Sequence, residues 1–379
     1  MKILINLSTL KKGGGQNVGL NFLKALLIVN NHSRYDLHFI VSKNSQIAKF
    51  VKQKFSKNYT TVPNNPIFRI LFELLLGQHL LKKNNIDIIY TIFGYGFYPR
   101  NVKQICGFAV SNIFFPEINF WVGLNYVDKI KKSLTDWFRL KTLKLADASI
   151  FENESMQKRS IELYNIKNTI FIKPSISIDL KDNKLESNID FSSITGFKGL
   201  FLCGWQKNKN YELIPQLLKK FKDNRVDLKI IFTAPKDNSK EHVAFIKDLK
   251  KYNIEDRIIM PGQINHYELK NLYKNIDYVF LLSQLESFSN NIIESWYFRK
   301  LLIVSNEEWS RSICKEGACY VERNSIEDIY NKILSLINNS GKLTSILRNG
   351  DRNLKSYANV EEKVKNEINF VKYIYEKND

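Results

Sequence analysis

Two glutamates, Glu286 and Glu294, stand with seven residues between them where the apolar run YVFLLS gives way to a helical pattern. The run predicts a buried strand, and the segment that begins near Asn290 predicts a helix. The N-terminus of a helix presents free backbone N–H groups, which bind anions such as phosphate. Glu294 follows Asn290 by about one helical turn, roughly 6 Å along the axis. The order carboxylate, phosphate cradle, carboxylate therefore fits a ligand made of a sugar, a diphosphate and a ribose.

Strand-like apolar runs alternate with helical segments along the whole chain. In the first half the expected strands are KILINLSTL, LHFIVS, DIIYTIF, QICGFAV, ASIFE and TIFIKPSI, and in the second half GLFLCGW, LKIIFTAP, RIIMPG, YVFLLS and LLIVSN. The run from Asn125 to Ala146 predicts a long amphipathic helix between two of them. This alternation predicts an α/β fold with doubly wound, mostly parallel sheets.

The chain has 379 residues, more than one usual hydrophobic core holds, so two domains are expected. The polar, irregular stretch at 177–198 is typical of a linker. We expect two Rossmann-like domains that face each other across a cleft, with the last helix returning to the first domain. The predicted ranges are 1–177 for the acceptor-binding domain, 178–198 for the linker, 199–355 for the nucleotide-sugar-binding domain and 356–379 for the returning helix.

Three glycines, Gly13, Gly14 and Gly15, follow the first predicted strand in the segment KKGGGQ. We expect a tight loop there, in which the missing side chains let the backbone approach a phosphate or an acceptor closely. Gly14 and Gly15 are the stronger candidates for this contact. The alternative is an ordinary strand–helix turn that tolerates glycine.

The formal net charge of +19 suggests a polyanionic partner, such as nucleic acid, anionic lipid or a phosphorylated ligand. The lysines are spread along the chain, so a coding bias would explain the charge equally well. A nucleic-acid partner is not expected, because no basic motif with interleaved aromatic residues stands out.

The apolar segments are too short to serve as a leader or an anchor. The apolar part of MKILINLSTL is too short for a signal peptide. The longest apolar region, ILFELLLGQHLL, contains Glu73 and His79. That region falls short of the roughly 18 residues that a membrane span needs. We expect a soluble, cytoplasmic protein, and the basic charge would suit peripheral docking at the inner face of the cell membrane.

In this context the segment ESFSNNIIE resembles the E-x7-E arrangement of the retaining glycosyltransferases of family 4 (glycosyl transferases group 1), which have the GT-B fold. The resemblance covers most of the chain: the GGG loop, GLFLCGWQKNKNYELI, and LYKNIDYVFLLSQLESFSNNIIESW through LLIVSNEEWSRSI. It implies a hexosyltransferase that moves a sugar from a nucleotide diphosphate donor and retains the anomeric configuration. It implies no required metal or other cofactor.

The resemblance also implies roles for charged residues. Glu286 matches the glutamate that holds sugar hydroxyls near the reacting centre, and Lys209 matches the lysine that neutralises the leaving diphosphate. Developing negative charge on a leaving group needs such compensation. Many family members have Gly-Arg where this chain has Gly204-Trp205. Lys207 could supply the missing positive charge, or Trp205 could stack on a ligand.

The remaining implied contacts come mostly from backbone. Glu294 matches the glutamate that binds ribose hydroxyls, and the side chains of the SFSNN turn could add hydrogen bonds to those of its amides. Ser111 and Asn112 stand where the family often carries residues near the sugar, so they are candidates for sugar or acceptor contact. The expected donor-binding residues are Gly14, Gly15, Gly204, Lys209, Gly262, Ile264, Glu286, Phe288, Ser289, Asn290, Asn291 and Glu294.

The acceptor is less clearly defined. FGYGFYP and IFFPEINFW could form an aromatic surface for a sugar or a lipid-linked saccharide, or they could be core. With the family resemblance, this predicts an enzyme of bacterial surface-polysaccharide assembly that uses a UDP-sugar in preference to a GDP-sugar. Two alternatives stay open: a non-catalytic basic binding protein for polyanionic glycan or nucleic acid, and a nucleotide-sugar epimerase on the same fold.

Overall fold

The computed structural model describes the chain except residues 12, 31–34, 57, 95, 98–100, 122, 176–193, 265–267 and 378–379. The chain divides into two compact units. Unit 1 comprises Met1–Pro116, Leu124–Ser175 and Ala358–Asp379, and unit 2 comprises Glu117–Gly123 and Ile176–Tyr357. Most of the predicted linker at 178–198, namely residues 178–193, lies outside the described residues. None of the helices that the structure describes is both long and apolar enough to cross a bilayer.

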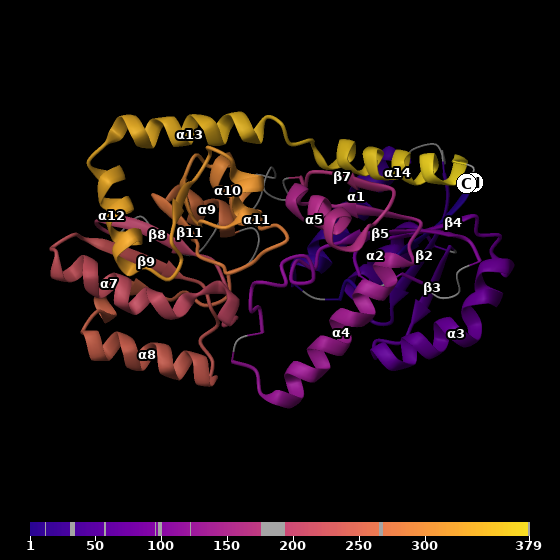
Figure 1. Ribbon diagram of the computed structural model, residues 1–379, viewed down its shortest axis with the longest axis horizontal. Helices are drawn as coiled ribbons and strands as arrows, with labels where there is room; N and C mark the ends of the chain where they lie inside the picture. The colour runs from indigo at the N-terminus through magenta and orange to yellow at the C-terminus, as the bar shows by residue number, and fades with distance from the viewer. Residues whose placement is uncertain are drawn as a thin grey trace. The chain divides into compact units, whose positions relative to one another are not determined.

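Unit 1 is built on a seven-stranded parallel sheet with the strand order β3-β2-β1-β4-β5-β6-β7 (Figure 1). Its strands are β1 (Lys2–Asn6), β2 (Asp36–Ser42), β3 (Tyr59–Val62), β4 (Ile88–Thr91), β5 (Lys103–Phe108), β6 (Ala148–Phe151) and β7 (Thr169–Phe171). Its helices are α1 (Gly13–Val29), α2 (Gln46–Lys54), α3 (Pro66–Lys83), α4 (Tyr126–Lys144), α5 (Glu154–Tyr164) and α14 (Val360–Glu376). The central strands are apolar and buried because helices cover parallel sheets on both faces.

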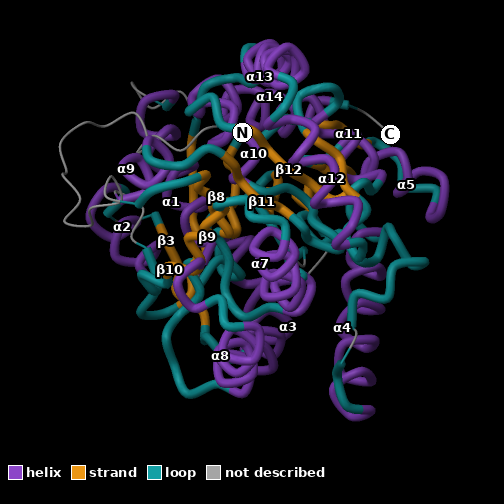
Figure 2. The backbone as a smooth tube through the Cα atoms, turned by 90° about the vertical axis from the view of Figure 1, so that its left-hand side faces the viewer, coloured by secondary structure: helices purple, strands orange, loops and turns teal. Residues whose placement is uncertain are grey.

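Unit 2 repeats this plan with a six-stranded parallel sheet in the order β10-β9-β8-β11-β12-β13. Its strands are β8 (Phe197–Phe201), β9 (Leu228–Phe232), β10 (Ile258–Ile259), β11 (Tyr278–Leu281), β12 (Leu301–Ser305) and β13 (Cys319–Val321). Its helices are α7 (Ile214–Asp223), α8 (Lys240–Tyr252), α9 (Leu269–Lys274), α10 (Asn290–Tyr297), α11 (Glu308–Cys314), α12 (Ile326–Ile337) and α13 (Ser340–Leu354), with the short turns η1 (Lys207–Lys209), η2 (Tyr211–Leu213) and η3 (Glu255–Arg257). Figure 2 shows the strands surrounded by helices. The predicted α/β class with two Rossmann-like domains is confirmed.

The strand order of unit 2 reverses direction between β8 and β11. From β8 the chain winds outward to β10, and from β11 it winds outward to β13. At this junction Gly199 of β8 pairs with Tyr278 of β11, and a Cβ at Gly199 would lie 2.4 Å from the Phe280 ring. Only glycine therefore lets the two strands pack as they do. Ligands of doubly wound sheets bind beside such a reversal, at the carboxyl ends of the strands.

The C-terminal helix α14 belongs to unit 1, where it packs beside α1. Lys363 of α14 is buried, and its Nζ donates to Oε1 of Glu152 at 2.7 Å and lies 3.3 Å from Oε1 of Glu367. Burial disfavours the charge on Lys363, but Glu152 and Glu367 outweigh burial and raise the pKa of Lys363. This buried ionic cluster joins α14 to the segment that follows β6.

Two expectations for unit 1 need correction. The GGG segment is not a loop, because Gly13, Gly14 and Gly15 form the first turn of α1. Gly13 has a φ of +59°, which favours glycine at the point where the chain enters the helix. The aromatic residues of IFFPEINFW do not form an exposed platform at Phe114 and Phe115, which are 0% and 1% exposed and belong to the core.

Candidate functional site

Two residues predicted from the sequence meet at the strand reversal of unit 2. Lys209 follows β8, and Glu286 follows β11. The Nζ atom of Lys209 donates to Oε1 of Glu286 at 2.5 Å, and the two side chains are 23% and 14% exposed. A partly buried pair of this kind keeps some contact with solvent, so a ligand can reach either charge.

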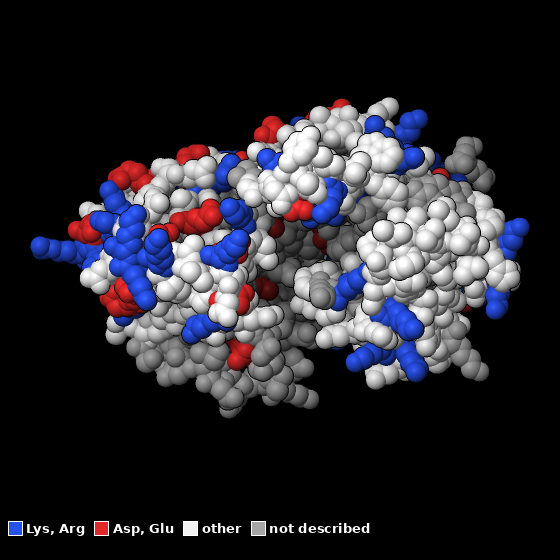
Figure 3. All heavy atoms as spheres, turned by 90° about the horizontal axis from the view of Figure 1, so that it is seen from below, with Lys and Arg blue, Asp and Glu red and all other residues white. Residues whose placement is uncertain are grey.

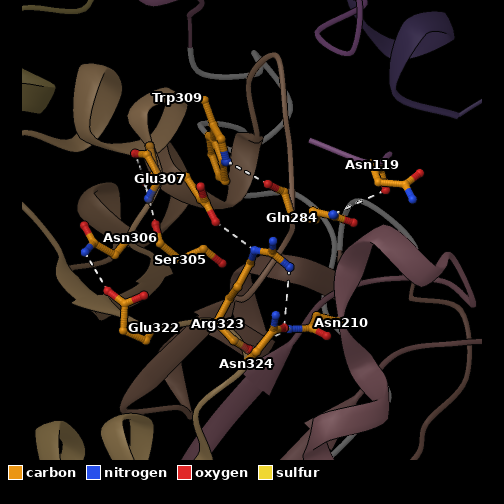
Figure 4. A network of polar contacts seen from close by, with 11 residues as sticks. Asn119, Asn210, Gln284, Ser305, Asn306, Glu307, Trp309, Glu322, Arg323 and Asn324 are labelled. Atoms are coloured by element: carbon orange, nitrogen blue, oxygen red, sulfur yellow. Dashed lines mark hydrogen bonds and ion pairs between the residues drawn. The ribbon is translucent and has the colours of Figure 1, made fainter. Parts of the chain in front are cut away.

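The loop that carries Lys209 is fixed by its neighbour Asn210. Asn210 has a φ of +61°, a left-handed conformation that asparagine tolerates better than most residues. Its Nδ2 donates to the carbonyl oxygen of Arg323 at 2.7 Å and reaches Oδ1 of Asn324 at 3.4 Å (Figure 4). This contact ties the end of η1 to the segment after β13.

The same network continues across the carboxyl edge of the sheet. Nε of Arg323 pairs with Oε1 of Glu307 at 2.7 Å, and Nδ2 of Asn306 donates to Oε1 of Glu322 at 2.8 Å (Figure 4). On the other side, the backbone N–H of Gln284 donates to the carbonyl oxygen of Asn208 at 2.7 Å. The loops after β8, β11, β12 and β13 thus hold one another, which positions Lys209 against Glu286.

Helix α10 begins directly after the turn that contains Ser289. Ser289 is extended and makes no side-chain cap, so its hydroxyl does not occupy the first N–H groups of the helix. Asn290 is exposed, whereas Asn291 is 7% exposed and its Nδ2 donates to the carbonyl oxygen of Leu202 at 3.4 Å. The ring of Phe288 lies 6.3 Å from that of Tyr357. The side chain of Asn291 therefore makes a protein contact, and backbone amides remain the expected donors to a phosphate.

The second glutamate lies inside the unit. Glu294 is 4% exposed, and its Oε2 accepts a hydrogen bond from the hydroxyl of Tyr273 on α9 at 2.9 Å. Burial raises the pKa of Glu294 to about 7, although the Tyr273 hydrogen bond acts in the opposite direction. The sequence pattern did not reveal Tyr273, because α9 and α10 are separate helices and no periodicity relates their residues.

The raised pKa predicts that Glu294 lowers stability at alkaline pH. A change in pKa from 4.5 to about 7 corresponds to about 3 kcal/mol. The folded state binds the proton more tightly, so this stabilisation is complete below pH 4.5 and is lost as the pH rises through 7. We expect Glu294→Gln to raise the free energy of unfolding at pH 8 by up to about 3 kcal/mol and to change it little at pH 4.5. Urea unfolding of both proteins at the two pH values measures this, and an equal difference at both would contradict it.

Trp205 and Lys207, the two candidates for replacing the family's arginine, have different surroundings. Trp205 packs among aromatic rings, with ring centroids 5.2 Å from Phe232 and 5.5 Å from Phe245, and its Nε1 donates to the carbonyl oxygen of Pro235 at 2.8 Å. The structure therefore gives Trp205 a role in packing within unit 2. The Lys207 side chain is half exposed, and its Nζ lies 4.0 Å from Oε1 of Glu212.

The glycines expected near the donor differ in their backbone conformation and in the space that a Cβ atom would have. Gly262 has a φ of +87°, and a Cβ there would meet no atom within 4 Å, so its backbone borders open space beside half-buried Ile264. A Cβ at Gly204 would lie 3.1 Å from Nε2 of Gln206. At Gly14 a Cβ would meet nothing within 4 Å, and at Gly15 it would only touch Leu10. Packing therefore does not require glycine at positions 14 and 15.

The two candidates for sugar or acceptor contact lie in unit 1, after β5. Ser111 is 7% exposed, and its carbonyl oxygen accepts from the backbone N–H of Phe114. Asn112 donates from Nδ2 to Oδ2 of Asp136 at 2.6 Å, and Asp136 also pairs with Arg139. Asn112 therefore contributes at least one hydrogen bond to the packing of α4.

Comparison with known proteins finds a family model that matches part of the chain. Residues 200–353 match the model of the family described as Glycosyl transferases group 1. Among curated protein sequences, none matches the chain.

Solved structures share the whole architecture. A glycosyltransferase from Rickettsia africae has a TM-score of 0.72 at 18% identity, over 100% of this chain and 99% of that one. Sucrose-phosphate synthase from Thermosynechococcus elongatus has a TM-score of 0.72 at 12% identity, over 99% of both chains. HepE from Anabaena, solved in complex with UDP, has a TM-score of 0.71 at 14% identity, over 98% of this chain and 100% of that one. At these identities the likeness shows the fold.

Proposed function

We propose that the chain is a glycosyltransferase of the glycosyl transferases group 1 family with a GT-B fold, and specifically a retaining hexosyltransferase of family 4. Its proposed donor is a nucleotide diphosphate sugar, with UDP favoured. The acceptor is a saccharide or a lipid-linked saccharide, and the pathway is bacterial surface-polysaccharide assembly. The support for the donor is the uridine nucleotide held by the similar Anabaena structure and the site geometry of unit 2.

The observation that carries the proposal is the Lys209–Glu286 pair at the strand reversal of unit 2. A doubly wound sheet binds nucleotides at this edge, beside the N-terminus of a helix. Here the edge brings together a cation for a diphosphate, an anion for sugar hydroxyls, and the uncapped start of α10. The proposed donor site in unit 2 needs no residue from another edge of this sheet.

In the proposed reaction the bond between the anomeric carbon and the diphosphate oxygen breaks, the acceptor oxygen bonds to the same face of the sugar, and the proton of the acceptor hydroxyl passes to the leaving diphosphate. Lys209 stabilises the negative charge that develops on the diphosphate, and the α10 amides add to this effect. Glu286 positions the sugar and stabilises the positive charge on its ring, without covalent attack. The proposal includes no metal. NMR of the product determines whether the anomeric configuration is retained.

Unit 1 is the proposed acceptor unit. It contains 29 lysine and arginine residues against 14 aspartate and glutamate residues, whereas unit 2 contains 28 against 24. The net charge is therefore +15 for unit 1 and +4 for unit 2. The net positive charge is concentrated in unit 1, because unit 2 has more acidic residues. A cytoplasmic enzyme docked at the inner face of the membrane would use this charge to reach a lipid-linked acceptor.

Calorimetric titration with UDP and then GDP, without metal, tests the donor proposal. We expect the wild-type protein to bind UDP at least about ten-fold more tightly than GDP, and Glu294→Ala to weaken the binding of UDP by about ten-fold or more, because a charged hydrogen bond is lost. Exposed Asp223→Ala at the C-terminal end of α7 serves as the control and should bind UDP like the wild type.

The opposite result would also be informative. If neither nucleotide binds, the donor site is wrong and the non-catalytic alternative becomes the better interpretation. That alternative predicts binding to polyanions with steep salt dependence and no need for a nucleotide. If GDP binds more tightly than UDP, the location of the donor site is supported and the assignment of the base is wrong.

A further inference from the structure

Helix α3 buries an ion pair and exposes six of its apolar residues. Arg69 and Glu73, 5% and 0% exposed, face the core of unit 1 and form an ion pair of 3.1 Å. The outward face exposes 44% or more of each of six apolar residues: Ile67, Phe68, Leu71, Leu74, Leu75 and Leu76. A helix in contact with water alone normally has the reverse arrangement. This outer face therefore fits an apolar environment.

The charges around this face have one sign. Glu73 is the one carboxylate of α3, and it is buried, while Lys82 and Lys83 are exposed in the last turn. An apolar helix face bordered by lysines is typical of a helix that lies in the interface of a membrane.

Helix α4 presents a second face of the same kind. Tyr126, Ile130, Leu134 and Trp137 follow one another at spacings of four, four and three residues, and each is exposed. They line a shallow hollow of about 600 Å³. Of all the residues of α4, Thr142 and Leu143 are the buried ones, so the apolar stripe is not used for packing within unit 1. The exposed lysines of α4 are Lys129, Lys131, Lys132, Lys141 and Lys144.

The two helices lie on the same side of unit 1. Both are drawn along its lower side in Figure 1 and remain low in Figure 2, after a turn of 90°. Figure 3 looks at this side and shows a broad uncharged area where α3 lies, with lysine and arginine at its margins. We call the exposed apolar residues of α3 and α4 the α3–α4 face.

We propose that the α3–α4 face docks on an anionic lipid bilayer. Its apolar side chains enter the boundary between headgroups and acyl chains, and its lysines meet the lipid phosphates. The net charge of +15 on unit 1 favours this partner over a second copy of the chain, because a symmetric contact would bring two positive faces together. This inference rests on the membrane docking in the proposed function and names the surface that carries it.

Co-sedimentation with vesicles tests the proposal. We expect the wild-type protein to bind vesicles that contain phosphatidylglycerol at least about ten-fold better than vesicles of phosphatidylcholine alone. Phe68→Ser with Leu75→Ser should reduce this binding by about ten-fold or more. The matched control is Val243→Ser with Ile161→Ser, at residues that are 61% and 47% exposed on α8 and α5, and it should bind like the wild type. All four positions are exposed, so the folds should survive.

Three outcomes would overturn the proposal: no binding of the wild type to either vesicle, equal losses in the patch and control variants, or dimerisation that Phe68→Ser with Leu75→Ser abolishes. The last would make a second copy the partner, and sedimentation velocity would detect it. UDP titration of the same variants separates this proposal from the donor proposal, because the patch variant should bind UDP normally even if docking fails.

Discussion

Lys209→Met and Glu286→Ala are expected to reduce turnover by similar factors and to have opposite effects on nucleotide affinity. Each should lower kcat by about 10²–10³, the usual loss when one group that stabilises transition-state charge is removed. Lys209→Met should also weaken UDP binding by at least about ten-fold, because it leaves the Glu286 carboxylate beside the diphosphate. Glu286→Ala should leave UDP affinity unchanged or tighter, because it frees Lys209 from its 2.5 Å ion pair.

Calorimetry with UDP and initial rates with the donor identified by that titration measure both effects. Lys219→Met, which removes an exposed lysine on α7 that pairs with Asp223, is the control and should change neither quantity by more than about two-fold. If Glu286→Ala weakens UDP binding as much as it lowers kcat, Glu286 holds the nucleotide rather than the sugar. If Lys209→Met leaves both unchanged, Lys207 becomes the candidate for the diphosphate.

Lys363→Met is expected to lower the free energy of unfolding of unit 1 by about 3–5 kcal/mol at pH 8. It leaves two carboxylates, Glu152 and Glu367, buried without the cation that each now contacts at 2.7 and 3.3 Å. Burial already raises the pKa of Glu367. The loss should therefore shrink at lower pH, where the carboxyl groups take up protons.

Urea unfolding followed by circular dichroism at pH 8 and pH 5 measures this loss. Lys365→Met, an exposed neighbour on α14, should stay within about 0.5 kcal/mol of the wild type. Replacing all three members of the cluster by apolar residues should recover most of the stability, because no unpaired charge then remains. A loss below 1 kcal/mol in Lys363→Met at pH 8 would show that α14 depends on its apolar contacts instead.

The sequence predicted the central strands and the edge strands β7 and β10, and it missed the edge strands β3 and β13. Long apolar runs such as YVFLLS and LLIVSN are buried on both faces and became β11 and β12. The strands β3 (Tyr59–Val62) and β13 (Cys319–Val321) are short and lie at the edges of their sheets. Their residues carry little periodic signal, and their backbones become strands because β2 and β12 offer hydrogen-bond partners.

For the candidate site, the sequence supplied the charged residues and tertiary structure supplied their partners. The motif could be recognised from residue types and spacing, and Lys209 from the family resemblance. The ion pair joins residues 77 positions apart, and Asn210 and Tyr273 contribute through contacts with other segments. The local pattern around Trp205 also carried no sign that its ring would pack among Phe232 and Phe245.

By itself, then, the sequence determined the α/β class, the central strands, several of the helices and the carboxylate spacing, because these depend on local periodicity and residue chemistry. Only the tertiary structure decided which face each helix turns inward. In α3 the Arg69–Glu73 pair is buried together with Leu80 and Leu81, whereas Leu71, Leu74, Leu75 and Leu76 face outward. Periodicity fixes which residues share a face of a helix; packing against the sheet decides which face meets the core, and which is left for a partner.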